Sequence, residues 1–181
     1  MNRIAVALAL MLTLPASAQA ARYTDPTLGY TISYPASWTL DTAYVNDTQG
    51  PSHEIKGISL TIPASMTQGT NLGGDTKLSV ESLPGQNCQP SQFVDPADNV
   101  RHIVSHGIHY TVADSSDAGA GNRYETTVYV VDGTSPCIAV RTFIHYSAIE
   151  NFDPSSGVKA FDRAKLIAAF DRIRASLRLG K

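Results

Sequence analysis

The stretch Gly29-Tyr30-Thr31-Ile32-Ser33-Tyr34-Pro35 is the clearest strand in this 181-residue chain. Its large aromatic and aliphatic side chains alternate with hydroxyl side chains, and a period of two places the large ones on a single face. Pro35 ends the run, because proline has no amide hydrogen to donate to a neighbouring strand. The stretch therefore predicts a strand with one buried face.

The same alternation recurs further along the chain, in runs that are rich in Val, Ile, Thr and Tyr. These predicted strands are residues 58–62, 77–81, 124–131 and 138–146. The first two runs predict strands with one buried and one wet face. Turn-forming residues 132–136 separate the last two runs, which predicts that they pair as a hairpin.

A second hairpin is predicted over residues 100–112, with His106-Gly107 as its two-residue turn. Such a turn needs positive φ at both positions, which glycine accepts freely and histidine tolerates better than most residues. This register places Ile103 opposite Tyr110. His102 and His109 then share the other face of the hairpin.

The C-terminal residues change to a helical period. Apolar side chains recur at Leu166, Phe170, Ile173 and Leu177, with Asp162 as the expected N-cap. Arg174 and Arg178 are expected to complement the dipole of the last turn, and Gly180 to end the helix. A helix with so definite an apolar stripe must cover a sheet face, since it is not stable alone in water. The fold class predicted is α+β.

Three polar segments are expected to be surface loops: residues 64–75, 114–122 and 151–157. Loops that a rigid scaffold positions often carry function. Residues 114–122 match neither an EF-hand nor a P-loop, and they predict a flexible hairpin connection.

The first twenty residues have the features of a secretory signal. Arg3 provides a positive start, residues 4–14 form an apolar run, and Ala18-Gln19-Ala20 is a small-x-small cleavage site, with Ala16-Ser17-Ala18 as the competing site. The apolar run is too short to span a bilayer. We therefore expect residues 1–20 to be removed on export and residues 21–181 to form one domain in the periplasm or outside the cell.

Composition argues against several kinds of partner. The chain has a formal net charge of −2, and its Lys and Arg residues are scattered rather than clustered. A protein that binds nucleic acid presents a basic patch. We expect no nucleic-acid partner, no membrane span and a soluble mature protein.

The only cysteines are Cys88 and Cys137. An even pair in an oxidising compartment predicts a disulfide. The disulfide would close a loop of 137 − 88 = 49 positions. In the chain-entropy model this adds roughly 4 kcal/mol to the free energy of unfolding. Neither a Cys-x-x-Cys redox motif nor a zinc-ligand pattern is present.

Candidate catalytic and metal-binding residues are few. His102 and His109, diagonal across the predicted hairpin, are candidates for a shared metal, with His106 as a third ligand. The wet face of a hairpin explains the same residues without a metal. No Gly-x-Ser-x-Gly motif for a nucleophilic serine occurs, and no catalytic residue or cofactor is predicted.

Both ends of the chain resemble a known family. Tyr23-Thr24-Asp25-Pro26, the Gly29–Pro35 stretch and Trp38 are similar to the opening of PsbP-like domains, and residues 170–179 are similar to their closing helix. The resemblance implies an α/β/α sandwich around a mainly antiparallel sheet, with Trp38 in the core. It also implies an exported bacterial branch of a superfamily whose members are mostly non-enzymatic accessory subunits, assembly factors and envelope proteins.

The sequence therefore predicts an exported, non-catalytic binding or accessory protein that acts on an envelope protein or a small ligand. A lined cavity between the sheet and its loops would favour the small ligand. Two alternatives remain open: a metal-dependent hydrolase that uses His102 and His109, and an inhibitor that inserts one loop into a foreign enzyme.

Overall fold

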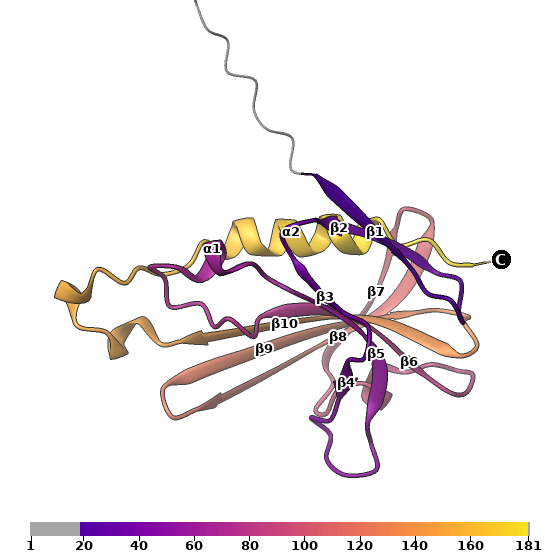
Figure 1. Ribbon diagram of the computed structural model, residues 1–181. Helices are drawn as coiled ribbons and strands as arrows, with labels where there is room; N and C mark the ends of the chain where they lie inside the picture. The colour runs from indigo at the N-terminus through magenta and orange to yellow at the C-terminus, as the bar shows by residue number, and fades with distance from the viewer. Residues whose placement is uncertain (1–18, 181) are drawn as a thin grey trace, which may run out of the picture.

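The computed structural model describes residues 19–180. Its body is an eight-stranded antiparallel sheet with the strand order β3-β5-β6-β10-β9-β8-β7, in which β4 also pairs with β5 (Figure 1). The strands are β3 (Thr39–Asp41), β4 (Val45–Asn46), β5 (Ile55–Thr61), β6 (Lys77–Leu83), β7 (Asp98–Ser105), β8 (Ile108–Gly119), β9 (Asn122–Val131) and β10 (Cys137–Ser147). A single-turn helix α1 (Ala64–Thr67) and two 3-10 turns, η2 (Ile149–Asn151) and η3 (Pro154–Ser156), lie in the connections.

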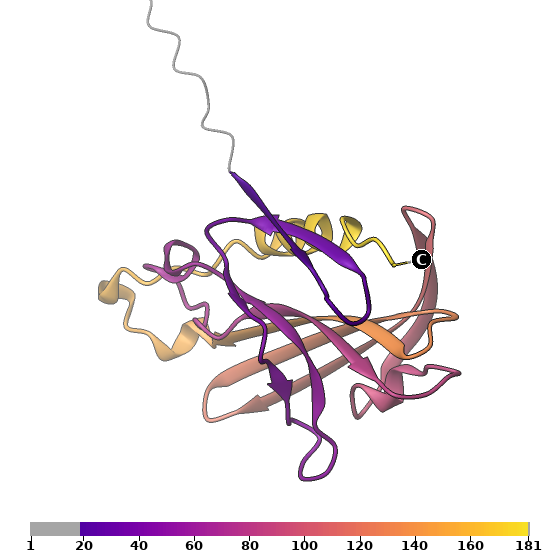
Figure 2. The same ribbon diagram turned by 45° about the vertical axis from the view of Figure 1, so that its right-hand side comes forward.

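Helix α2 (Arg163–Ala175) and a separate two-stranded sheet lie over one face of the main sheet (Figure 2). The Asp162 carboxylate caps the helix by accepting a hydrogen bond from the Lys165 amide at 2.9 Å. The predicted apolar stripe is fully buried against the sheet, with Trp38 and Phe170 in edge-to-face contact at 5.6 Å between ring centres. The cover by the C-terminal helix and the core position of Trp38 are confirmed.

The Gly29–Pro35 stretch forms strand β2 (Thr31–Pro35), but it lies outside the main sheet. It pairs with β1 (Ala20–Thr24), a strand that the sequence did not predict. Thr31 also exchanges two backbone hydrogen bonds with Arg178, at 2.8 and 2.9 Å. This pairing explains why α2 ends at Ala175 rather than at Gly180, since the chain must become extended to reach β2.

Arg174 has a different environment from the one predicted. Its guanidinium is buried beneath the helix, 4.6 Å from the ring centre of Tyr129 and 5.5 Å from that of Tyr110. Asp171 accepts a hydrogen bond from it at 3.1 Å. The side chain therefore stabilises the contact between the helix and the sheet through the two aromatic rings as well as the end of the helix.

The hairpin of β7 and β8 has the predicted register. Ser105 pairs with Ile108 and Ile103 pairs with Tyr110, while His106 and Gly107 have φ values of 54° and 79°. The hairpin connection expected at residues 114–122 does join two strands, but its length is wrong, because the turn is only Ala120-Gly121. β8 continues to Gly119 and pairs with β9 down to Asn122, because the polar residues of this segment face solvent from within a regular strand.

The face opposite α2 is also buried, in part. Ser59, Ser79 and Glu81, which the sequence placed on wet strand faces, are all buried. Segment 84–97, with the 3-10 turn η1 (Pro90–Gln92), inserts Phe93 and Val94 onto this face. The α+β class with a mainly antiparallel sheet is confirmed, but within the described residues this segment stands where a second helical layer was expected.

The signal predicted for residues 1–20 lies almost wholly outside the described residues; Gln19 and Ala20 are described, and Ala20 begins β1. Across residues 19–180 no helix is both long and apolar enough to cross a bilayer.

Candidate functional site

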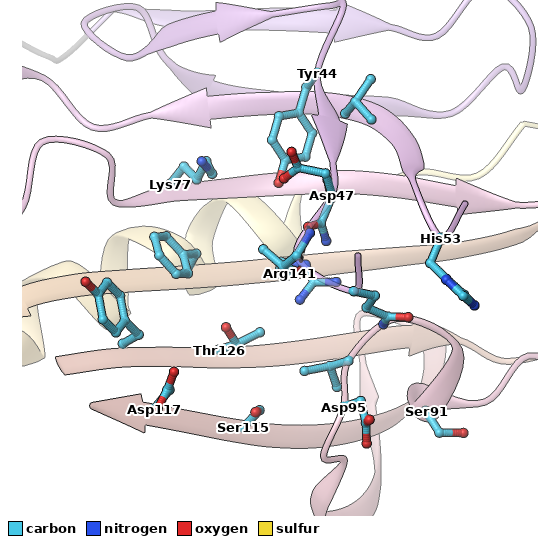
Figure 3. Close-up of a pocket in the computed structure, with 17 residues that line it drawn as sticks. Tyr44, Asp47, His53, Lys77, Ser91, Asp95, Ser115, Asp117, Thr126 and Arg141 are labelled. Atoms are coloured by element: carbon cyan, nitrogen blue, oxygen red, sulfur yellow. Dashed lines mark hydrogen bonds between the residues drawn. The ribbon is translucent and has the colours of Figure 1, made fainter. Parts of the chain in front are cut away.

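A cleft of about 950 Å³ opens on the face of the main sheet opposite α2. Strands β6, β10, β9 and β8 form its floor, and the residues around β4 and the segment after η1 form its walls (Figure 3). The floor includes Lys77, Arg141, Phe143, Thr126 and Ser115. In the register of the sheet, Lys77 pairs with Phe143, Phe143 with Thr126 and Thr126 with Ser115, so these four side chains form one row across the sheet.

A buried ion pair lies beside this row. Arg141 donates to both carboxylate oxygens of Glu81, from Nε at 2.8 Å and from Nη2 at 3.0 Å, and Nη2 also contacts the carbonyl of Phe93. Only 1% of Glu81 and 5% of Arg141 is exposed. The bidentate geometry satisfies both groups, which is the condition under which charges are tolerated in a protein interior.

Two further side chains complete the shell around Glu81. The Ser79 hydroxyl donates to its carboxylate at 2.7 Å, and the Asn46 amide donates at 3.3 Å. Gly57 pairs with Glu81 across the strands, and a Cβ at this position would lie 2.1 Å from the Val80 carbonyl oxygen. Only glycine therefore fits opposite the ion pair.

Lys77 lies between two aromatic rings. Its ammonium is 5.3 Å from the ring centre of Tyr44 and 5.4 Å from that of Phe143, distances at which cation–π attraction operates. Tyr124 stacks beside Phe143 at 6.2 Å and against His145 at 4.6 Å. His145 Nδ1 in turn contacts the Asp75 carboxylate at 2.7 Å. Three of these rings, those of Tyr44, Phe143 and Tyr124, line the cleft.

The Tyr44 hydroxyl is held in its neutral form. Burial, and secondarily the negative charge of Glu81, raise the pKa of Tyr44 to about 12, against a smaller lowering by Arg141. Burial disfavours the phenolate because charge is costly to remove from water. Tyr44 therefore stays neutral over the whole physiological pH range.

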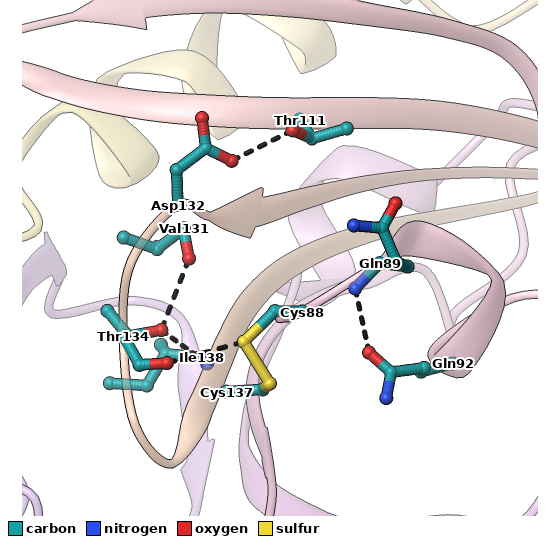
Figure 4. The surroundings of a disulfide bond; sticks show 9 residues. All are labelled: Cys88, Gln89, Gln92, Thr111, Val131, Asp132, Thr134, Cys137 and Ile138. Carbon is teal, nitrogen blue, oxygen red and sulfur yellow. Dashed lines mark hydrogen bonds between the residues drawn. A yellow bond between two sulfur atoms is a disulfide. The ribbon is translucent and has the colours of Figure 1, made fainter. Parts of the chain in front are cut away.

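A disulfide joins Cys88 to Cys137 (Figure 4). It lies in the segment whose later residues, Val94 and Asp95, line one wall of the cleft. It joins segment 84–97 to the start of β10, with 5.4 Å between the Cα atoms. Gln89 and Gln92 form a capping box at η1, in which the Gln89 amide donates to the Gln92 side chain at 2.7 Å. The predicted disulfide is confirmed, and it positions the residues that follow it along the cleft.

The histidines that sequence singled out do not lie in this cleft. His102 contacts the Thr111 hydroxyl at 3.1 Å, and Thr111 donates to Asp132 at 2.8 Å. His109 pairs with Val104 on the same face, and His106 occupies the turn. Within residues 19–180, no three His, Cys, Asp or Glu side chains are grouped so as to hold a metal ion.

Sequence reasoning missed the cleft because its residues come from six separate segments. One signal was present: Glu81 and Arg141 are oppositely charged residues inside strand patterns that are mostly apolar or hydroxyl-bearing. Opposite charges at such positions indicate a buried pair, since an unpaired charge would not be tolerated there.

Comparisons with known proteins bear on the fold. No family model and no curated protein matches the sequence. A crystal structure from Bacteroides thetaiotaomicron VPI-5482 matches with a TM-score of 0.51 and 12% identity, over 88% of this chain and 48% of that one. The chain thus spans about half the length of that structure. At this identity the similarity shows the fold alone.

A second match is the solution structure of cyanobacterial PsbP (CyanoP) from Synechocystis sp. PCC 6803. It covers 94% of this chain and 98% of that one, with 14% identity and a TM-score of 0.34. At this TM-score the match carries no argument.

Proposed function

We propose that this protein is an exported binding module whose cleft takes a small polar ligand. The observation that supports this most is the cleft itself, which is about 950 Å³ and combines aromatic rings with many polar groups. Sites for small molecules are concave and have a few polar groups fixed among apolar ones. The Glu81–Arg141 pair and the disulfide-anchored wall hold these groups in place before a ligand arrives.

Export is supported by two features. The leader at residues 1–20 has the composition of a secretory signal, and the Cys88–Cys137 disulfide is typical of oxidising compartments. Expression of the full chain in a bacterial host tests this part. The mature protein should be found in the periplasm or medium with Ala21, or with Gln19 for the competing cleavage site, as its first residue. An intact N-terminus and reduced cysteines would contradict it.

The binding site is tested by blocking the cleft. Ser115 lines it, whereas its neighbour Ser116 does not and points to the other face of β8. Ser115→Trp projects a large ring into the cleft, and Ser116→Trp adds the same bulk to the opposite face. Wild type and both variants are screened by thermal shift against sugars, amino acids, nucleosides and organic acids.

We expect at least one compound to raise the Tm of wild type and of Ser116→Trp but not of Ser115→Trp. Both variants must first show wild-type circular dichroism, so that loss of binding is not loss of folding. If Ser115→Trp responds as wild type does, or if no compound stabilises wild type, the cleft is not a small-molecule site.

A further inference from the structure

The free charges of the cleft make a polyanion an unsuitable ligand. Asp47, Asp95 and Asp117 come from the β4–β5 connection, the segment after η1 and β8, so carboxylates surround the cleft on three sides. All three are exposed, and within the described residues none of them forms an ion pair. A polyanion would meet a like charge on each of these sides.

A cation meets a like charge only on the floor of the cleft. Lys77 is partly buried, is held between the rings of Tyr44 and Phe143, and has no carboxylate partner among residues 19–180. Arg141 is already paired with Glu81 and so does not change this balance. The free charges therefore argue against a polyanion, and a cation is the competing ligand that the test must include.

Hydroxyl-bearing side chains complete the polar lining. Thr48, Ser91, Ser115 and Thr126 all line the cleft, and a hydroxyl both donates and accepts hydrogen bonds. The β4 wall is different, because Tyr44 and Val45 line it and 44% of Val45 is exposed. The ligand that fits has many hydroxyl groups and also an apolar surface.

We infer that the cleft binds a neutral oligosaccharide. This inference rests on the proposed binding function and adds the class of ligand. The carboxylates of Asp95 and Asp117 accept hydrogen bonds from sugar hydroxyls, and the Lys77 ammonium donates to hydroxyl or ring oxygens. Tyr44 and Val45 pack against the apolar C–H surface of a sugar ring.

The test is isothermal titration of the mature protein with five probes. Three are neutral: maltotriose, cellotriose and tri-N-acetylchitotriose. Two are charged: trigalacturonate and spermidine. We expect at least one neutral probe to bind, and each charged probe to bind at least about tenfold more weakly.

Variants locate the contacts. Asp117→Asn and Lys77→Met should each weaken binding of the neutral probe by about tenfold or more, as expected for loss of a hydrogen bond to a charged group. Lys77→Arg, which keeps a charged donor, should retain more affinity than Lys77→Met. Glu150→Gln removes an exposed carboxylate in η2 that does not line the cleft, and it should leave the affinity unchanged.

The outcomes separate this inference from the proposed function. If a charged probe binds in the cleft and no neutral probe does, the ligand class is overturned while the binding function stands. The same holds if no probe binds but the thermal-shift screen finds a compound that Ser115→Trp blocks. If both the titrations and the screen are negative, both proposals fail.

Discussion

The two faces of the main sheet are made by the same strands and have opposite chemistry. Toward α2, residues such as Leu78, Val80 and Val140 form a dry apolar core. On the opposite face, their neighbours Glu81 and Arg141 are just as buried but form an ion pair on the floor of an open cleft. Both faces are stable, one by burial of apolar area and the other by satisfied hydrogen bonds.

This difference shows how a small α+β domain can have a polar cleft on one face of its sheet and an apolar core on the other. The helix closes one face, which leaves the other face free to carry polar groups at fixed positions. The following variants test whether the two faces depend on these two kinds of interaction.

The largest effect is expected on the helix face. Phe170→Ala removes a buried ring that packs against Trp38, and it should lower the free energy of unfolding by about 3–5 kcal/mol. Ile167→Ala, in the same helix, changes a side chain that is 39% exposed. It should cost less than about 1 kcal/mol in the same urea unfolding experiment. Equal losses in the two variants would mean that α2 does not pack as described.

A loss of similar size is expected on the cleft face, from a different cause. Arg141→Met leaves the Glu81 carboxylate buried without its partner, and it should destabilise the protein by about 3–5 kcal/mol. The double variant Glu81→Leu/Arg141→Met removes both charges, and it should be more stable than Arg141→Met alone. If the double variant loses as much stability as the single variants Glu81→Leu and Arg141→Met lose together, the two residues do not interact.

The disulfide is expected to have a somewhat smaller effect. Replacing Cys88 and Cys137 by serine should lower stability by about 2–4 kcal/mol, because the unfolded chain is no longer constrained. A reductant should lower the Tm of the wild type to about that of the double serine variant, and it should leave the Tm of the double serine variant unchanged. Should the reductant shift both proteins alike, the loss does not come from this bond.

How far the sequence predicts each face depends on how local the signals are. The cover of one sheet face by the helix was predicted from the period of two in the strands and the helical period of the C-terminal residues. The register of β7 and β8 was predicted from the turn residues His106-Gly107 alone. The cleft face was missed because Lys77, Phe143 and Ser115 are adjacent only through strand pairing between distant segments. Strand β2 was predicted correctly as a strand, but its partner β1 has too weak a pattern to be seen.

The smallest expected effect is a pH dependence at Tyr44. Because its pKa is raised to about 12 in the folded protein, the unfolded chain loses this proton first, from about pH 10. Its contribution to stability is therefore fully present below pH 10 and is lost as the pH rises toward 12.

Tyr44→Phe should accordingly lose less stability than the wild type between pH 10 and pH 12. The stability lost over this pH range should differ between the two proteins by less than about 2.7 kcal/mol. That value corresponds to a pKa change from 10 to about 12, and the real difference is smaller because Tyr44 is partly exposed. Absorbance titration at high pH gives an independent check. It should show that the variant lacks one late-titrating tyrosine, and loss of a tyrosine that titrates near pH 10 would contradict the buried environment.

The most direct test of the central claim, that the face opposite α2 is the ligand site, is an NMR titration of the isotope-labelled mature protein. The ligand is the compound that gives the largest thermal shift. The amide signals of Ser115, Thr126 and Phe143 should move on binding, while that of Ile167 on the helix stays in place. Shifts confined to the helix or to the β7–β8 hairpin, with the cleft signals unmoved, would contradict the account.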